Sequence, residues 1–466
     1  MKTIYTITAS AGITTASAKA VVFHTEPVRM KPTKRMEENK EEDFMKKLIS
    51  TFATACIAFT LTGCNNNTIP MEDYLNTNKG TSVYNQIMKT ENGYYYNDAY
   101  TGKMSLRYHD NTTGNDIYLC AKPECTHDGD EFCTATSPYS PCYTGMYNDT
   151  IYIAALGVKK TGLDYGINYK LLKASLDGTD LTEVCTFIQL SGEKSSIGLK
   201  YEDTRTMILH RGYAFIPYSL RYDYTSEDEI AGLAIIKLSD GSIQTMPEYE
   251  KTNETAYQNI TPYGDYIYYT LSKTELHRYN FQTGEDEILP LKENLTETYG
   301  NDFSKKIKEL NTYTIIDDKV WYLCGGTKKS KSSMFIYDPA ENTTTLVEGF
   351  GDKLQAETTT YNKSGEPTGT STNYCVSPQP MYDGNYLYIV GQGFFASEYD
   401  YYDMQVHIFT LEGERLGGFV FERKGSCQVN ILDETFYIQT PEGTVYCSVA
   451  DVISGNIEWK ELYQFN

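Results

Sequence analysis

Four cysteines and one histidine lie close together in a single short stretch of the chain. Their spacing is Cys120-x4-Cys125-x-His127-x5-Cys133-x8-Cys142. Thiolate sulfur and imidazole nitrogen are the donors that Zn²⁺ prefers in tetrahedral protein sites. In an oxidising compartment the same thiols form disulfides, which stabilise long loops that lack secondary structure. This stretch is therefore the most concentrated chemistry that the sequence contains.

Three interpretations of this stretch stay open: a disulfide, a metal site that includes His127, and unpaired thiols. The spacing lacks the paired Cys-x2-Cys of common zinc ribbons. We therefore expect first a disulfide between at least two of the four cysteines, acting as a local staple that the fold survives losing, with zinc as the alternative. Most other cysteines fall in expected strands, where inert core thiols are the default: Cys185, Cys324, Cys375, Cys427 and Cys447.

No arrangement typical of catalysis accompanies the cysteines. His109, His210, His277 and His407 occur singly, mostly in or beside expected strands. The chain has no Gly-x-Ser-x-Gly elbow, no His-Glu-x-x-His pair and no phosphate-binding glycine loop. The sequence thus favours a protein that is not an enzyme. It predicts no catalytic residue, and no cofactor apart from the zinc alternative.

An internal repeat indicates the elements that must position this stretch. A polar turn followed by a short aromatic and aliphatic strand recurs seven times. Aligned on their shared aromatic position, the copies carry Tyr95, Tyr152, Phe215, Tyr268, Trp321, Tyr388 and Tyr437. Tight Asp or Gly turns of the hairpin type follow most copies, as in Asp177-Gly178-Thr179 and Ser239-Asp240-Gly241.

A further strand precedes each polar turn, which makes four strands per repeat. The sequence therefore predicts an all-β fold, a β-propeller of seven four-stranded blades over residues 82–466. Six or eight blades, and a two-sheet β-sandwich, are the alternatives. Composition agrees, since 42 tyrosines occur in 466 residues and aromatic residues favour strands.

The N-terminal region has the layout of a bacterial lipoprotein signal. Lys46 and Lys47 precede an apolar stretch that ends at Leu61-Thr62-Gly63-Cys64. The stretch is shorter than the roughly 20 residues that a membrane-spanning helix needs. We expect residues 45–63 to be a cleaved signal peptide, Cys64 to carry a lipid, and residues 64–81 to be a tether. Residues 1–44 are expected to be a mis-assigned start or a disordered extension.

Charge limits the partners of the exported part. Residues 1–63 hold nine of the 41 Lys and Arg and six of the 62 Asp and Glu, so the remainder carries a net charge of −24. Such a surface repels nucleic acid and anionic headgroups. We expect a monomer on the outer face of the cell membrane, attached through its lipid alone.

Propeller connectivity predicts where a ligand would bind. The turns between strands 1 and 2, and between strands 3 and 4, are short, so variable insertions fall on the opposite face, where recognition usually resides. The expected insertions are 2–3 loops at 158–167, 218–230, 325–333 and 394–404, and crossings between blades at 121–141, 190–205, 291–311 and 352–374. Aromatic candidates for a glycan or peptide site are Tyr218, Tyr222, Tyr224, Phe394, Phe395, Tyr399, Tyr401 and Tyr402.

A resemblance emerges from these features together. The Leu61 to Cys64 signal, the repeated Tyr-Tyr strand, the Leu-Asp-Gly-Thr turns and the Leu-Cys-x-Lys-Pro-x-Cys-x-His stretch resemble the propeller lipoproteins of Gram-positive anaerobes. Their repeats are similar to TolB-type and YWTD-type propellers. The resemblance implies a binding scaffold, here for a glycan or an envelope protein, with no family catalytic residues to transfer. A polysaccharide-active enzyme with its site near the central channel is the alternative.

Overall fold

The computed structural model describes most of the chain from Ile87 to Gln464, together with two short strands near the N-terminus, β1 (Thr6–Thr8) and β2 (Ser17–Lys19). The segments left out between residues 87 and 464 are 99–104, 128–132, 136–139, 162–163, 192–206, 221–229, 251–256, 273–274, 301–312, 328–329, 362–365, 393–400, 425–427, 433 and 441–442. The expected signal peptide, Cys64 and the tether therefore lie outside the described residues. The chain divides into two compact units, Met1–Thr68 and Ile69–Asn466.

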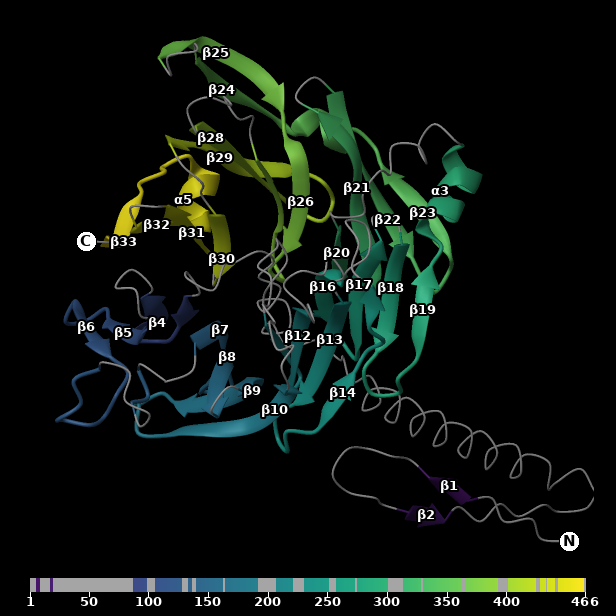
Figure 1. Ribbon diagram of the computed structural model, residues 1–466. Coiled ribbons are helices and arrows are strands. Elements are labelled where there is room, and N and C mark those ends of the chain that lie inside the picture. Colours follow the sequence, from purple (N-terminus) through teal and green to yellow (C-terminus); the bar gives the residue numbers. More distant parts are fainter. Residues whose placement is uncertain are drawn as a thin grey trace, which may run out of the picture. The chain divides into compact units, whose positions relative to one another are not determined.

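Seven antiparallel four-stranded sheets make up the second unit, and they form a ring, the seven-bladed β-propeller that the repeat predicts (Figure 1). Each blade is built from consecutive strands. The first three blades comprise β3 (Met88–Lys89), β4 (Gly93–Asp98), β5 (Ser105–Asp110) and β6 (Asn115–Tyr118); β7 (Ser140–Tyr147), β8 (Thr150–Thr161), β9 (Asp164–Ser175) and β10 (Leu181–Ser191); β11 (Ile208–His210), β12 (Tyr213–Leu220), β13 (Ile230–Lys237) and β14 (Ile243–Thr245).

The other four blades repeat this order. They comprise β16 (Gln258–Tyr263), β17 (Tyr266–Ser272), β18 (Glu275–Asn280) and β19 (Asp286–Leu289); β20 (Tyr313–Ile316), β21 (Lys319–Thr327), β22 (Ser330–Asp338) and β23 (Thr343–Val347); β26 (Val376–Tyr382), β27 (Leu387–Gln392), β28 (Tyr401–Phe409) and β29 (Arg415–Lys424); β30 (Gln428–Leu432), β31 (Thr435–Thr440), β32 (Gly443–Ser448) and β33 (Lys460–Gln464).

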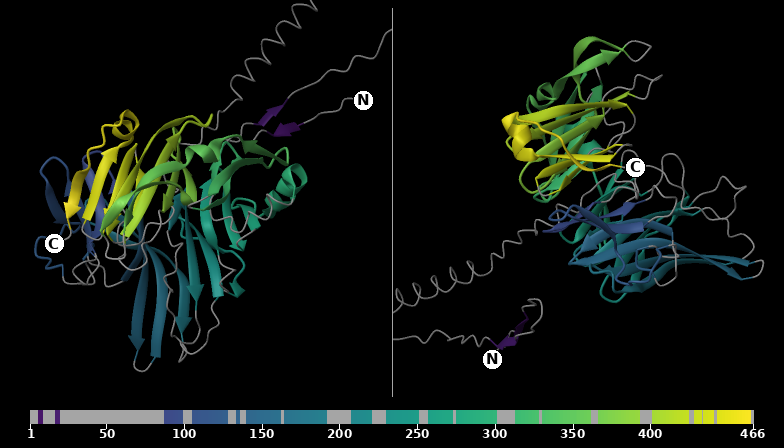
Figure 2. Two further views of the ribbon diagram at one scale, coloured as in Figure 1. Left: turned by 90° about the horizontal axis from the view of Figure 1, so that it is seen from above. Right: turned by 90° about the vertical axis from the view of Figure 1, so that its left-hand side faces the viewer.

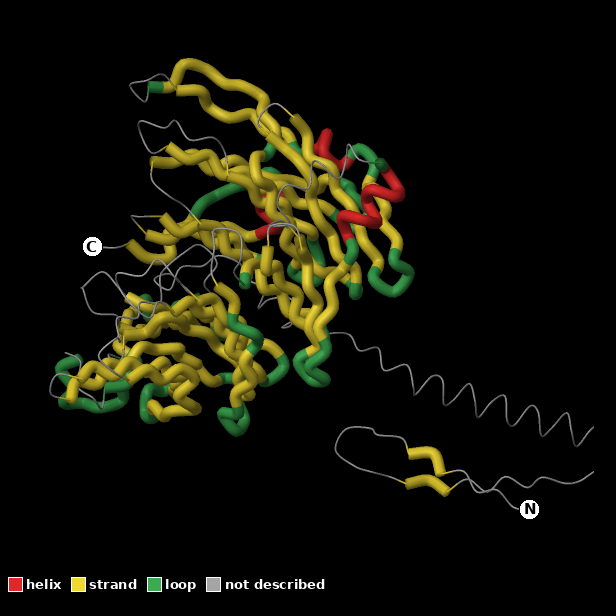
Figure 3. Tube along the Cα trace, turned by 45° about the vertical axis from the view of Figure 1, so that its right-hand side comes forward, coloured by secondary structure: helices red, strands yellow, loops and turns green. Residues whose placement is uncertain are grey.

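A few elements lie outside this pattern (Figure 3). They are β15 (Tyr249–Glu250), which pairs with β13, the hairpin of β24 (Gln355–Tyr361) and β25 (Pro367–Tyr374), the helices α3 (Leu291–Tyr299) and α5 (Val449–Ser454), and the 3-10 helix η2 (Phe350–Lys353). Among the described residues, no helix is both long enough and apolar enough to cross a bilayer.

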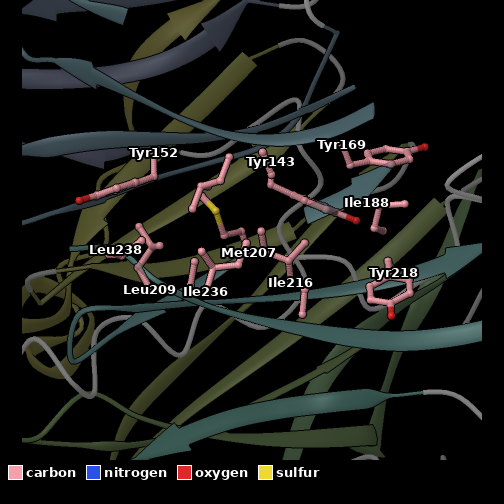
Figure 4. Close-up of a cluster of buried hydrophobic side chains, with 14 residues drawn as sticks. Tyr143, Tyr152, Tyr169, Ile188, Met207, Leu209, Ile216, Tyr218, Ile236 and Leu238 are labelled. Atoms are coloured by element: carbon pink, nitrogen blue, oxygen red, sulfur yellow. The ribbon is translucent and has the colours of Figure 1, made fainter. Parts of the chain in front are cut away.

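The seven repeated aromatic residues have one shared role. Each lies in strand 2 of its blade and is buried, and each belongs to a different apolar cluster. Tyr152, for example, belongs to a cluster that combines Tyr143 and Tyr169 of its own blade with Leu209 and Ile216 of the next blade (Figure 4). The repeat therefore encodes the interfaces between blades, which hold the ring together.

The ring closes between the first and last blades, which lie side by side in Figures 1 and 2. We call this junction the seam: Ile87, Tyr94 and Tyr96 of blade 1 pack with Tyr437 of blade 7. The Tyr94 hydroxyl also donates to the carbonyl oxygen of Leu462 at 3.2 Å. Among the described residues, the seam cluster holds four buried residues, with Leu432, Tyr446 and Leu462 packed against them, whereas the cluster between blades 2 and 3 holds fourteen.

Two expected loops are strands instead. Val158 pairs with Ile167 near the end of the β8–β9 hairpin, and Gly325 pairs with Ser332 in the β21–β22 hairpin. The prediction was wrong because lysine, glycine and serine interrupt the apolar alternation there, although the backbone ladder continues. The expected crossing at 291–311 begins with helix α3, and the crossing at 352–374 contains the β24–β25 hairpin.

Candidate metal centre

The outer strand of blade 1 ends early, and the cysteine stretch begins at that end. Strand β6 stops at Tyr118, and the next residue, Leu119, donates its backbone N–H to the carbonyl oxygen of Leu106 in β5 at 3.0 Å. The chain then leaves the sheet and returns at Ala135, whose carbonyl oxygen accepts from the N–H of the same Leu106 at 2.9 Å. Both ends of the excursion are thus fixed to one residue of the blade.

Blade 2 holds the base of this excursion. The buried Thr134 hydroxyl lies 2.6 Å from the carbonyl oxygen of Leu119 and 2.8 Å from that of Gly178, in the β9–β10 turn. The Gly178 oxygen also accepts from the N–H of Ala121 at 3.1 Å. Gly178 has φ +69°, and a Cβ there would lie 2.8 Å from the backbone nitrogen of Cys120. Only glycine fits this close approach without strain.

Four side chains meet above this base, and we call them the Cys/His cluster: Cys120, Cys125, His127 and Cys133. One donor atom from each lies within 4.8 Å of all the others. The His127 Nδ1 is 3.5 Å from the Cys133 sulfur. Cys133 is fully buried, and the other three are partly buried. The structure places these four of the five candidate residues together, and the cluster could hold one metal ion.

The imidazole of His127 is held in place by an aromatic neighbour. It stacks on the Tyr118 ring with a centroid distance of 4.4 Å and an interplanar angle of 24°. The guanidinium carbon of Arg107 lies 4.3 Å from the centroid of the same ring, and an Arg107 nitrogen donates to the Tyr118 hydroxyl at 2.8 Å. His127 itself has φ +57°, a left-handed conformation that is rare outside glycine. Neither contact was visible in the sequence.

The Cys120 and Cys125 thiols of the cluster differ in pKa because of their surroundings. Burial raises the pKa of Cys120, but hydrogen bonds from the Lys122 backbone and from Thr134 outweigh this and lower it to about 7. The backbone N–H of His127 lowers the pKa of Cys125, yet burial and the neighbouring Cys133 and Cys120 thiols raise it to about 11. A thiolate at Cys120 can therefore form near neutral pH beside a protonated neighbour.

The disulfide that we expected first is not formed in the structure. Cys120, Cys125 and Cys133 are free cysteines, because their sulfur atoms converge with His127 on one point rather than approaching in bonded pairs. Cys142 lies in β7, at an irregularity in its pairing with β8, and its side chain is outside the described residues. The disulfide therefore stays a prediction that a mass measurement must test.

The aromatic residues proposed for ligand binding do not form one group. Tyr218 is 6% exposed, lies in β12 within the cluster between blades 2 and 3, and donates its hydroxyl to Glu248 at 2.9 Å. It is a packing residue, because strand β12 continues through it. Tyr401 and Tyr402 begin β28, opposite Lys424 and Arg423 of β29. The others lie outside the described residues: Tyr222, Tyr224, Phe394, Phe395 and Tyr399.

Each of the four single histidines lies on a different strand, and the side chains contact neighbouring residues of the blades. His210 contacts the carbonyl oxygen of Gly264 in the next blade at 2.7 Å. His277 stacks on Tyr269, and both side chains contact Asp286. His109 pairs with Asp116 at 3.0 Å. His407 is buried, which, with the nearby Arg415 charge, lowers its pKa to about 3 and keeps it neutral.

No family model matches the chain, and no curated protein is significantly similar to it. Solved structures with similar traces include a computationally designed protein, Ika8, at 9% identity and TM-score 0.41, covering 83% of this chain and 88% of that one. An oligogalacturonate lyase from Vibrio parahaemolyticus matches at 11% identity and TM-score 0.40, covering 77% and 82%. An acylaminoacyl peptidase matches at 10% identity and TM-score 0.41, where 84% of this chain spans about half, 53%, of that protein. At these values the assignment of a seven-bladed propeller rests on the seven sheets themselves.

Proposed function

We propose that this chain is a lipid-anchored propeller on the outer face of the cell membrane, where it binds a glycan or another envelope protein. The Leu61-Thr62-Gly63-Cys64 signal supports the anchor and the address. The seven interfaces between blades support a scaffold role, because buried aromatic packing at every junction gives a rigid ring on which loops can present a ligand site.

One observation carries the choice of binding over catalysis. Among the described residues, the four histidines outside the Cys/His cluster lie on different strands. His210 contacts a neighbouring blade, His277 contacts Tyr269 and Asp286, and His109 contacts a carboxylate. His407 is buried and neutral. These hydrogen bonds and ring contacts lie within or between blades, and they support a structural role for the four positions.

Charge narrows the class of ligand. The part after the expected cleavage site carries a net charge of −24, which disfavours polyanions and favours neutral sugars or the basic surface of a protein. Stacking on a sugar ring requires exposed aromatic faces. The proposed face is the one with the 2–3 connections, including those that precede Ile230 and Tyr401.

The binding proposal is tested on the chain from residue 64 onward with Cys64→Ser, which prevents lipidation. Glycan arrays and capture of envelope proteins should give saturable binding, and Tyr222→Ala with Tyr224→Ala should weaken it. Thr283→Ala, in a 3–4 turn on the other side of a blade, is the control and should leave it unchanged. Reproducible cleavage of a polysaccharide, lost on changing a carboxylate near the channel, would instead favour the enzyme alternative.

The anchor is tested separately. Cys64→Ala should abolish incorporation of labelled fatty acid, whereas Cys56→Ala, inside the apolar stretch of the signal, should leave labelling intact. Labelling that persists in the Cys64 variant would show that the protein is not anchored in this way.

A further inference from the structure

The four donors of the Cys/His cluster enclose one point beside the end of β6. We propose that the cluster binds one Zn²⁺ ion in a closed, four-coordinate structural site, which fastens the end of the outer strand of blade 1 to the β9–β10 turn of blade 2. This inference is independent of the binding function proposed above, because it rests on different residues and needs no ligand on the long-loop face.

The distances match those of a tetrahedral zinc site. Zn–S bonds of about 2.3 Å and a Zn–N bond of about 2.0 Å place nitrogen and sulfur about 3.5 Å apart and two sulfurs about 3.8 Å apart. The observed separation between His127 Nδ1 and the Cys133 sulfur is 3.5 Å, and all four donors lie within 4.8 Å of one another. One separation thus equals the value for a tetrahedral site, and the others lie within about 1 Å of the expected range or closer.

The chemistry of the donors selects the metal. Thiolate and imidazole ligands suit zinc, whereas Mg²⁺ and Ca²⁺ require oxygen ligands. Four protein donors also complete a tetrahedral shell, and catalytic zinc sites keep one position for water or substrate. Three cysteines and one histidine therefore indicate a structural ion rather than a reaction centre.

His127 supplies a second observation that points to a ligand. Its left-handed backbone, at φ +57°, costs on the order of 1 kcal/mol or more, and such conformations persist where other interactions compensate for them. The stack on Tyr118 leaves Nδ1 facing Cys133, so Nδ1 is the atom that would coordinate the ion.

The location gives the ion its role. Cys120 and Cys133 stand at the two ends of the excursion, next to the two backbone contacts with Leu106. Cys125 and His127 lie between them in the chain, so coordination would fold the excursion back onto its own base. The base touches Gly178 of blade 2, so the ion would keep the Thr134 and Ala121 contacts with that turn in place.

The test begins with the metal content of the full chain, purified without chelators and with zinc in the growth medium. We expect about one zinc per chain, and tetrahedral thiolate bands in the visible and near-ultraviolet spectrum after exchange for Co²⁺. Cys125→Ser and Cys133→Ser should lose most of the zinc. His127→Cys should keep it, since four thiolates also form a closed site. The matched control Cys185→Ser, at a free cysteine in β10, should keep it as well.

Intact mass without reductant completes the test and stays informative if a variant fails to fold. Full mass, free thiols after metal removal and one bound zinc support the proposal. A loss of two hydrogens localised to two cysteines of the cluster, with no zinc, would overturn it in favour of the disulfide. Zinc that survives Cys125→Ser in folded protein would place the ion at another site, and a folded chain with neither zinc nor a disulfide would leave the cluster as plain thiols.

Discussion

The junctions between blades 1 and 2 and between blades 2 and 3 use the same contact in two different ways. In both, the glycine of a 3–4 turn lies against the last part of the preceding blade. Gly178 lies against Leu119 and Cys120, just after the outer strand β6, and Gly241 lies against Val184 and Cys185, within the outer strand β10. Both glycines have φ near +70°. A cysteine therefore lies at the same place in each junction.

The two junctions differ in the chain beyond this cysteine. Strand β10 runs on past Cys185 to Ser191 and stays paired with β9, so a backbone ladder secures the second junction. Strand β6 has already ended before Cys120, and the Cys/His cluster follows it in the chain. Under the zinc proposal, side-chain ligands at the first junction would take the role that the β9–β10 backbone ladder has at the second.

The largest effect is expected from filling the glycine contacts. Gly178→Ala should lower the free energy of unfolding by about 2 kcal/mol, because a left-handed alanine is strained and its Cβ meets the Cys120 backbone. Gly241→Ala should destabilise similarly, but only Gly178→Ala should also reduce bound zinc. Gly114→Ala, at φ +69° with open space around it, is the control and should cost about 1 kcal/mol. Denaturant titration measures the free energy of unfolding, and metal analysis measures the bound zinc. Equal zinc in all three variants would show that the Gly178 turn does not support the Cys/His cluster.

Thiol reactivity should distinguish the two cysteines next. The pKa of Cys120 is lowered to about 7, whereas burial raises the pKa of Cys185 to about 11. At pH 8 the metal-free protein should be alkylated at Cys120 about 20-fold faster than at Cys185. This ratio allows for the lower nucleophilicity of the more acidic thiol. Thiolate is lost as the pH falls through 7, so the Cys120 rate should drop about tenfold between pH 8 and pH 6. Peptide mapping after timed alkylation gives both rates, and similar rates would contradict the assigned environments.

Removing the metal should loosen only the first junction. After treatment with a chelator under reducing conditions, protease cleavage within residues 121–127 should accelerate about tenfold, because these described residues belong to no helix or strand and lie beside the proposed ion. Cleavage within β10 should not change, since its ladder with β9 needs no ion. Limited proteolysis read by mass spectrometry compares the segments in one sample. Loss of protection over the whole ring would show that the ion supports more than this rim.

The smallest effect is expected at the hydroxyl that joins the excursion to blade 2. Thr134→Val should cost about 1 kcal/mol, because it removes a buried donor shared by the carbonyl oxygens of Leu119 and Gly178. Thr186→Val, which removes an exposed hydroxyl donating to Glu183 in β10, is the control and should stay within about 0.5 kcal/mol. Equal effects in thermal unfolding would mean that the Thr134 hydroxyl does not couple the blades.

Prediction from sequence succeeded where one residue type recurs in one environment. The aromatic residues from Tyr95 to Tyr437 revealed the blade count, because each fills an equivalent interface. It failed where pairing with a neighbouring strand, rather than local sequence, sets the length of a strand. Tyr218 was expected in a loop, although β12 extends through it, and the expected loop around Val158 is paired strand. The cluster was found from spacing, but spacing alone could not show that the Cys120, Cys125 and Cys133 sulfur atoms and one His127 nitrogen lie within 4.8 Å of one another.

The closure of the ring has a mechanical consequence. Blades 1 and 7 each take all four strands from their own stretch of chain, and they meet through the small seam cluster and the Tyr94 contact with Leu462. The seam is therefore the junction of the ring next to Ile87, where the described part of the propeller begins. Tension applied through the preceding segment, as the proposed membrane tether would apply it, would act on the seam before it separates the strands of any blade.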